Sequence, residues 1–137
     1  MLGPCAMLIE VTSGAMTAMQ QAAASALPNE ACGILLGKNN RITGAIETRN
    51  VHPSPATHFE IDPQALIDAY RVERGGGPEV LGYFHSHPNG RAEPSDIDQA
   101  SAAGDGKLWA IIAADRVNFW LDEPEGFRLL SYAIASE

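Results

Sequence analysis

The chain has 137 residues, of which 45% are hydrophobic and 19% charged, as expected for a folded protein of one-domain size. This composition excludes collagen-like, coiled-coil and disordered chains. Seventeen acidic residues against nine Lys and Arg give a formal charge of -8, so most of the surface would repel phosphate backbones, and no nucleic-acid partner is expected.

Hydrophobic periodicity and turn residues predict the helices and strands. In chain order these are a strand at 7–12, a helix at 14–26, strands at 32–37 and 41–49, an extended piece at 59–61, a helix that opens at Pro63, a strand at 80–87, a helix of about two turns from Ser95 through Ala103, and strands at 108–114, 117–121 and 127–135. Ser13 is the expected N-cap of the first helix, and Leu27-Pro28 ends it. Helices interleaved with at least six strands indicate an α+β or mixed-sheet α/β fold, formed as one domain over residues 1–137.

Three features bear on location. Residues 1–7 lack a basic region and interrupt their apolar stretch with Gly3 and Pro4, so no signal peptide is expected. The long apolar run at 108–114 is far shorter than the ~20 residues of a membrane-spanning helix. Cys5 and Cys32 are too far apart in sequence for a disulfide framework or a Cys-rich zinc site. A cytoplasmic protein without a membrane partner is therefore expected.

The segment that follows the strand at 80–87 carries residues suited to metal binding. On a strand, His85 and His87 would project from one face, while Ser86 would point the other way. Pro88 ends the strand, and the loop after it can bring Asp98, on the first turn of the next helix, back toward the two imidazoles. Two histidines and one carboxylate form a catalytic zinc set, which leaves a fourth position for water and can lower its pKa to roughly 7.

Simpler interpretations of the same residues stay open. A His-x-His pair near a strand end is more often structural than metal-binding. Ser95 and Asp98 also have the spacing of a helix capping box. The two interpretations are compatible, because an N-cap Ser95 can still present its hydroxyl to a ligand while the first helical turn orients Asp98.

The combination resembles the JAMM (MPN+) zinc metallopeptidase family, whose motif is an upstream Glu, His-Ser/Thr-His, seven residues, Ser, two residues and Asp. His85-Ser86-His87, the seven residues 88–94, Ser95 and Asp98 match it without a departure. The segment 30–37, Glu-Ala-Cys-Gly-Ile-Leu-Leu-Gly, is similar to the Glu-bearing strand entry of the family. The resemblance implies a single MPN-type domain in which about three helices flank a mixed sheet, similar to the cytidine-deaminase-like architecture.

The resemblance also implies a role for each motif residue. His85, His87 and Asp98 would hold one Zn²⁺ per chain, Glu30 would be the catalytic base, and Ser95 would stabilise the oxyanion. Spacing alone does not select Glu30 over the other carboxylates considered, which are Glu10, Glu60 and Asp62. His52 and His58 are not expected to be ligands.

Other catalytic chemistries lack their motifs in this sequence. There is no His-Glu-x-x-His, no deaminase His-x-Glu with Pro-Cys-x-x-Cys, and no Gly-x-Ser-x-Gly. Gly75-Gly76-Gly77 is not followed by the Lys-Ser/Thr of a phosphate-binding loop and is expected to end a helix. Cys32 lies in an apolar run and is expected in the core rather than as a nucleophile.

The compact form resembles prokaryotic family members that process ubiquitin-like sulfur-carrier proteins. The implied reaction is hydrolysis of a peptide or isopeptide bond after the C-terminal Gly-Gly of such a partner. A Gly-Gly tail is narrow enough to pair with a sheet edge and pass through a slot that larger side chains cannot enter. A cell-wall or small-molecule amidase, a non-catalytic MPN interaction scaffold and a structural zinc site stay open as alternatives, and the sequence does not indicate an oligomeric state.

Overall fold

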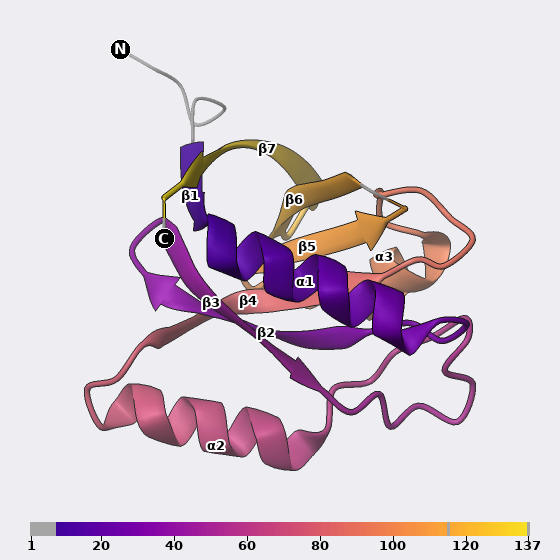
Figure 1. Ribbon diagram of the computed structural model, residues 1–137, viewed down its shortest axis with the longest axis horizontal. Coiled ribbons are helices and arrows are strands. Elements are labelled where there is room, and N and C mark those ends of the chain that lie inside the picture. The colour runs from indigo at the N-terminus through magenta and orange to yellow at the C-terminus, as the bar shows by residue number, and fades with distance from the viewer. Residues whose placement is uncertain (1–7, 115, 137) are drawn as a thin grey trace.

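The computed structural model describes residues 8–114 and 116–136 (Figure 1). Its elements are β1 Leu8–Thr12, α1 Ser13–Ala26, β2 Cys32–Lys38, β3 Arg41–Thr48, α2 Pro63–Arg74, β4 Glu79–Ser86, α3 Asp96–Ser101, β5 Leu108–Ala113, β6 Arg116–Glu123 and β7 Gly126–Ala135. Cys5 and the stretch predicted to lack a signal peptide lie outside the described residues. Within the described ranges, no helix is long and apolar enough to cross a membrane.

The strands form one mixed sheet that closes into a barrel in the order β1-β3-β2-β4-β5-β6-β7. The pairs β1–β3, β1–β7 and β4–β5 are parallel, and the other neighbours are antiparallel. β1 closes the barrel, because Leu8–Thr12 pair with β7 while Glu10 and Val11 also pair with β3. The predicted mixed sheet with three helices is confirmed, and the closure is an additional feature that the sequence pattern did not predict.

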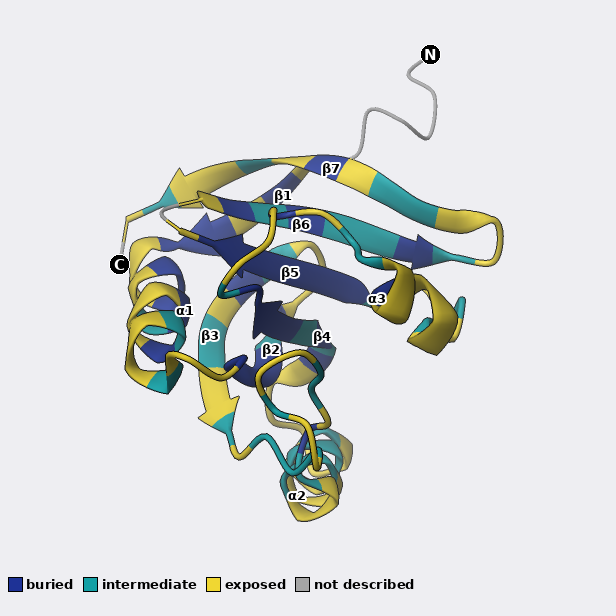
Figure 2. Cartoon of the chain, turned by 90° about the vertical axis from the view of Figure 1, so that its right-hand side faces the viewer, coloured by how far each residue is buried: buried dark blue, intermediate teal, exposed yellow. Residues whose placement is uncertain are grey.

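Two hydrophobic clusters hold the helices to the sheet. α1 lies across one side of the sheet and buries the face formed by Ala15, Met16, Met19 and Ala22 (Figures 1 and 2). α2 lies on the other side, where partly buried side chains pack on a smaller cluster that includes residues of β2 and β4. Both faces of β2 and β4 are therefore covered, as the apolar run at 32–37 predicted.

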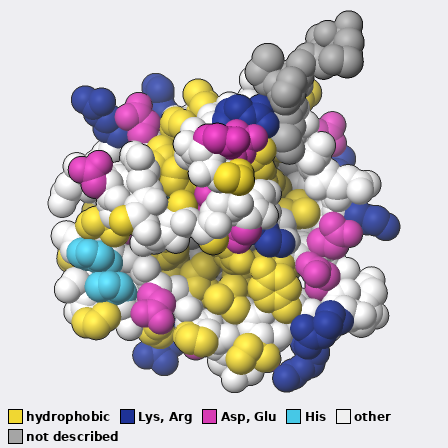
Figure 3. Space-filling view, turned by 180° about the vertical axis from the view of Figure 1, so that it is seen from behind, with side chains coloured by type: hydrophobic (Ala, Val, Ile, Leu, Met, Phe, Trp, Pro, Cys, Tyr) yellow, Lys and Arg dark blue, Asp and Glu magenta, His cyan; other side chains and the backbone are white. Residues whose placement is uncertain are grey.

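Charged side chains of both signs are interspersed on the surface. On the face shown in Figure 3, hydrophobic side chains gather near the centre and acidic and basic side chains lie around them. Exposed large hydrophobic residues also occur on β7, where Leu129 and Ile134 are more than half exposed.

The predicted strand ends lie within two residues of those in the structure, and two predictions at helix ends differ. Thr12, not Ser13, caps α1, since Thr12 Oγ1 accepts the Ala15 N–H at 3.1 Å. The predicted extended piece at 59–61 contributes an isolated bridge between Ile61 and Asn50. α3 ends at Ser101 rather than Ala103.

The register between β2 and β4 places the first residues of β2 beside the last residues of β4. Cys32 pairs with His85 and Gly33 pairs with Phe84. A Cβ atom on Gly33 would collide with the Phe84 ring and with the Ile46 carbonyl, so this close approach requires glycine. The residues before Cys32 are thereby held next to the C-terminal end of β4.

Candidate metal centre

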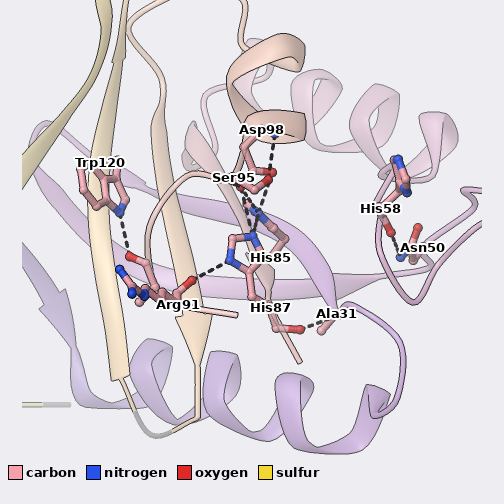
Figure 4. Close-up of polar contacts among 11 residues, drawn as sticks. Ala31, Asn50, His58, His85, His87, Arg91, Ser95, Asp98 and Trp120 are labelled. Carbon is pink, nitrogen blue, oxygen red and sulfur yellow. Dashed lines mark hydrogen bonds and ion pairs between the residues drawn. The ribbon is translucent and has the colours of Figure 1, made fainter. Parts of the chain in front are cut away.

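The end of β4 and the first turn of α3 bring the three predicted metal ligands together. His85 lies on β4 and His87 directly follows it, with the His87 N–H donating to the Ile112 carbonyl of β5 at 2.8 Å. Asp98 lies on the first turn of α3. The loop 88–94 joins these elements and folds α3 back over the strand end (Figure 4).

The donor atoms of the three side chains converge in a buried position. The Nε2 atoms of His85 and His87 are 3.0 Å apart, and each lies 3.1 Å from a carboxylate oxygen of Asp98. All three side chains are buried. Among the described residues, this is the group of His, Cys, Asp and Glu side chains that is arranged to hold a metal ion.

The arrangement fits a tetrahedral zinc ion. Zinc bonds of 2.0–2.1 Å to nitrogen place neighbouring ligand atoms about 3.3 Å apart in a tetrahedron, close to the separations found between these atoms. Two imidazoles and one carboxylate are also the ligand types that catalytic zinc sites use. The residues present therefore suit this metal.

His87 is held in the tautomer that metal binding needs. Its Nδ1 lies 2.6 Å from the Arg91 carbonyl oxygen, and because a carbonyl only accepts, Nδ1 carries the proton. In neutral His87 the lone pair is then on Nε2, the atom that faces the other ligands. Burial acts to lower the pKa of His87, but hydrogen bonds to Asp98 and Arg91 outweigh it and raise this pKa.

Aromatic side chains enclose His85. The Phe59 ring stacks on the imidazole at 4.2 Å between centroids, and Trp109 meets it edge-on at 5.7 Å. The resulting burial lowers the pKa of His85 and favours the neutral imidazole that binds metal. Asp98 is also buried, yet its hydrogen bonds to His85 and His87 hold its pKa well below the usual range, so it is a carboxylate.

Glu30 lies two residues before β2 and shares a cleft with the ligand His87. The cleft is about 360 Å³ and its lining residues include Glu30, His87 and Ser95. Burial raises the pKa of Glu30 to about 7, with His87 lowering it and Asp98 raising it further. This position and proton affinity suit a general base.

The other carboxylates that sequence spacing left open as the catalytic base have different surroundings from Glu30. Glu10 is on β1 and forms an ion pair with Arg41 at 3.1 Å. Asp62 caps α2 by accepting the Gln64 N–H, and Glu60 is exposed. Neither Glu10, Glu60 nor Asp62 lines the cleft.

Ser95 caps α3, as its spacing to Asp98 allowed. Its Oγ accepts the Asp98 N–H at 3.1 Å, while Asp98 Oδ2 accepts the Ser95 N–H at 2.9 Å, which completes a capping box. Accepting this bond leaves the hydroxyl proton of Ser95 available to a group in the cleft.

The structure also identifies supporting residues that the sequence did not single out. Ser86 Oγ accepts the Ala31 N–H at 2.8 Å and so ties β4 to the residue after Glu30. Asn50 Nδ2 donates to the Glu30 carbonyl at 3.1 Å. The alternation of His-Ser-His on a strand was a signal for Ser86, whereas nothing in the local pattern marked Asn50.

The remaining candidates do not belong to the ligand group. His52 and His58 stack on each other at 4.5 Å between ring centroids and do not belong to that group. Cys32 is buried, and burial raises the pKa of its thiol to about 11, which disfavours a nucleophilic thiolate.

The chain matches known proteins over most of its length. Residues 12–123 match the family model of prokaryotic homologues of the JAB domain. A protein named desampylase, from Haloferax volcanii, is 29% identical over 120 residues, which span 84% of this chain and 85% of that protein. A probable TtuB-protein conjugate cleaving protease from Thermus thermophilus is 39% identical over 71 residues, 52% of this chain and 47% of that protein.

Solved structures share the fold. A protein of Desulfitobacterium hafniense solved in solution has a TM-score of 0.84 and 30% identity, with 96% of this chain and 94% of that chain covered. The structure described as a JAMM metalloprotease-like zinc site in the proteasome and signalosome has a TM-score of 0.59 and 19% identity, with 93% and 99% covered, and supports the fold alone. From its family match and its fold, the chain belongs to the prokaryotic homologues of the JAB domain.

Proposed function

We propose that the protein is a zinc-dependent JAMM-type peptidase that hydrolyses the bond after the C-terminal Gly-Gly of a ubiquitin-like sulfur-carrier protein. The observation that carries this proposal is the buried group of His85, His87 and Asp98, together with the cleft that Glu30 and His87 both line. Relatives named desampylase and TtuB-protein conjugate cleaving protease support a ubiquitin-like substrate. One zinc per chain and a cytoplasmic location are parts of the proposal.

His85, His87 and Asp98 would hold the zinc ion, which when bound supplies Lewis-acid activation of a water molecule and of the scissile carbonyl. Glu30, with its pKa near 7, would accept a proton from the attacking water on its carboxylate and then deliver it to the departing amine. The Ser95 hydroxyl would donate a hydrogen bond to the carbonyl oxygen as negative charge develops there. Ligands and base on neighbouring elements would orient the water and the carbonyl for the reaction.

The cleft lining supports a narrow substrate segment. Ala56 and Gly90 are among its lining residues, and a Cβ atom on Gly90 would lie 3.1 Å from the Cβ of His87. An extended Gly-Gly tail can lie in such a cleft with its last carbonyl near the ligand group. We expect a larger residue at that position to bind less well.

The proposal is tested with zinc-loaded protein and a ubiquitin-like carrier that is extended by one residue past Gly-Gly. Intact mass measurement should show loss of the added residue, and replacing the last carrier Gly by Val should abolish the cleavage. Glu30→Gln should keep the zinc and lose the activity, whereas His87→Ala should lose the zinc. Equal cleavage of the Val carrier or of peptidoglycan stem peptides would favour the amidase alternative, and no cleavage of any of these by zinc-loaded protein would favour the scaffold.

A further inference from the structure

We infer that Asn118 and Trp120 of β6 are positioning residues for His87 and act through the loop 88–94. The two side chains are two residues apart on one strand and so project from the same face. Both donate to one acceptor, the Ala92 carbonyl, with Asn118 Nδ2 at 3.2 Å and Trp120 Nε1 at 3.1 Å. The inference rests on the metal centre in the proposed function.

The Ala92 carbonyl, which accepts both hydrogen bonds, is next in sequence to the carbonyl that orients His87. Ala92 follows Arg91, whose carbonyl oxygen accepts the His87 Nδ1–H at 2.6 Å (Figure 4). Consecutive peptide planes share a Cα atom, so fixing the Ala92 carbonyl restricts rotation of the Arg91 carbonyl. The chain of contacts therefore runs from β6 through two peptide groups to the imidazole.

The contacts of the Arg91 side chain and of Gly90 hold the loop less firmly than the two bonds to Ala92 do. The Arg91 side chain is 84% exposed and its contact with Glu93 is long, at 3.9 Å. A hydrogen bond from the Gly90 N–H to the His87 carbonyl, at 3.3 Å, closes the near end of the loop. Ala92, by contrast, is only 4% exposed, so its carbonyl is the buried point at which the loop is fastened to the barrel.

Sheet register places Asn118 level with His85, and Trp120 lies two residues further along β6. Asn118 pairs with Ile111 of β5, and Ile111 pairs with His85 of β4. The donors on β6 are thus carried by the same rigid sheet as the ligand strand. A loop fastened to this sheet holds the His87 ring in a fixed relation to His85, which is what a three-ligand site needs.

The test removes the two hydrogen-bond donors while keeping an aromatic side chain at position 120 and the backbone of β6. Trp120→Phe deletes the indole N–H, and Asn118→Ala deletes the amide. The matched control is Tyr132→Phe, which removes another aromatic hydrogen bond to a carbonyl, from Tyr132 Oη to Val117 of β6 at 3.0 Å. Two measurements are made on each variant: the rate at which zinc-loaded protein releases zinc to a chelator, and the solvent exchange of the His87 Nδ1 proton by NMR in the metal-free protein.

The double variant should release zinc about 10- to 100-fold faster than wild type, the usual effect of removing support from a metal ligand. The His87 Nδ1 proton of the double variant should exchange with solvent faster than that of wild type. In both measurements each single variant should give a rate between those of wild type and the double variant, and Tyr132→Phe should give the wild-type rate. Wild-type release and exchange in the double variant, or an equal effect in Tyr132→Phe, would overturn the inference and leave the metal centre intact. If wild type holds no zinc, the proposed function fails, and proton exchange in the metal-free variants still decides the role of the two donors.

Discussion

Burial makes Glu30 a carboxyl group that changes charge near neutral pH, and this has a consequence for stability. In the metal-free folded protein its pKa is about 7, whereas the ordinary value is 4.5. Between these values the folded state binds more protons than the unfolded state, so the free energy of unfolding falls as pH rises, by up to about 3 kcal/mol. Glu30→Gln does not titrate and should therefore lose less stability than wild type between about pH 5 and 8, as measured by urea unfolding of metal-free protein.

The control for this prediction is Glu60→Gln, because Glu60 is exposed and lies outside the cleft. Its pH dependence should follow that of wild type. Parallel curves for wild type and Glu30→Gln would mean that the Glu30 carboxyl is hydrated in the folded protein, and the argument for its raised proton affinity would fail.

Ser95 has two roles to separate, a cap that the structure shows and an oxyanion donor that we propose. Asp and Asn both cap helices about as well as Ser, so Ser95→Asp and Ser95→Asn should keep the melting temperature close to that of wild type. The Asp variant cannot donate and adds negative charge beside the scissile carbonyl, so hydrolysis should fall by ~10² or more. The Asn variant retains a donor and should lose less.

Bound zinc is measured in the same samples, since a carboxylate at this position lies near the ligand group. Full activity in Ser95→Asp with one zinc bound would leave Ser95 as a cap alone. If that variant loses zinc, its lost activity is assigned to the metal site. The activities of Ser95→Asn, which keeps a side-chain donor, and Ser95→Ala, which has none, would then decide the donor role.

The helices and strands were largely predictable because their signals are local. Apolar runs, prolines and glycines mark most elements within a few residues, and the capping box places Asp98 on the first turn of α3. Thr12 and Ser13 are adjacent hydroxyl residues, and only the geometry of the first turn selects Thr12 as the cap. Phe59 was predicted only as part of an extended piece. Its ring stacks on His85, a residue distant in sequence, and periodicity does not encode such a contact.

The segment between β3 and α2 is organised by the side chain of Asn50. Its Nδ2 donates to the carbonyls of Glu30 at 3.1 Å and His58 at 2.9 Å, and its Oδ1 accepts the N–H groups of His52 at 3.1 Å and Glu60 at 3.0 Å. Asn50→Ala removes these partners from partly buried backbone groups, which should destabilise the protein by about 2 kcal/mol. Amide hydrogen exchange in residues 51–60 should quicken more than exchange in the sheet.

Asn40→Ala provides a comparison, because Asn40 is an exposed residue of the hairpin turn between β2 and β3. That variant should stay within about 0.5 kcal/mol of wild type. Unchanged exchange in residues 51–60 of Asn50→Ala would show that other contacts hold the segment.

Closure of the barrel and assembly of the site were less accessible from sequence, because both join distant parts of the chain. The ligands lie within one short motif, so their spacing indicated the metal group. Glu30 reaches the same cleft only through the pairing of β2 with β4, and the family resemblance, not spacing, selected it. The pairing of β1 with β7 joins the two ends of the described chain, and no local pattern specifies it.

Because β1 closes the barrel, substitutions in β1 test whether the barrel unfolds cooperatively as one unit. Ile9 is 0% exposed and pairs with Tyr132 of β7, whereas its neighbour Leu8 is 54% exposed. Ile9→Ala should lower the free energy of unfolding by about 2–5 kcal/mol, the range for truncating a buried aliphatic side chain, and Leu8→Ala should change it by less than about 0.5 kcal/mol. If the barrel unfolds as one unit, urea unfolding of Ile9→Ala should show a lower midpoint with an unchanged slope. The far-ultraviolet signal and the fluorescence of the two tryptophans, Trp109 and Trp120, should then change together. Separate transitions for the two signals would mean that β1 and β7 open without the sheet that carries the metal ligands.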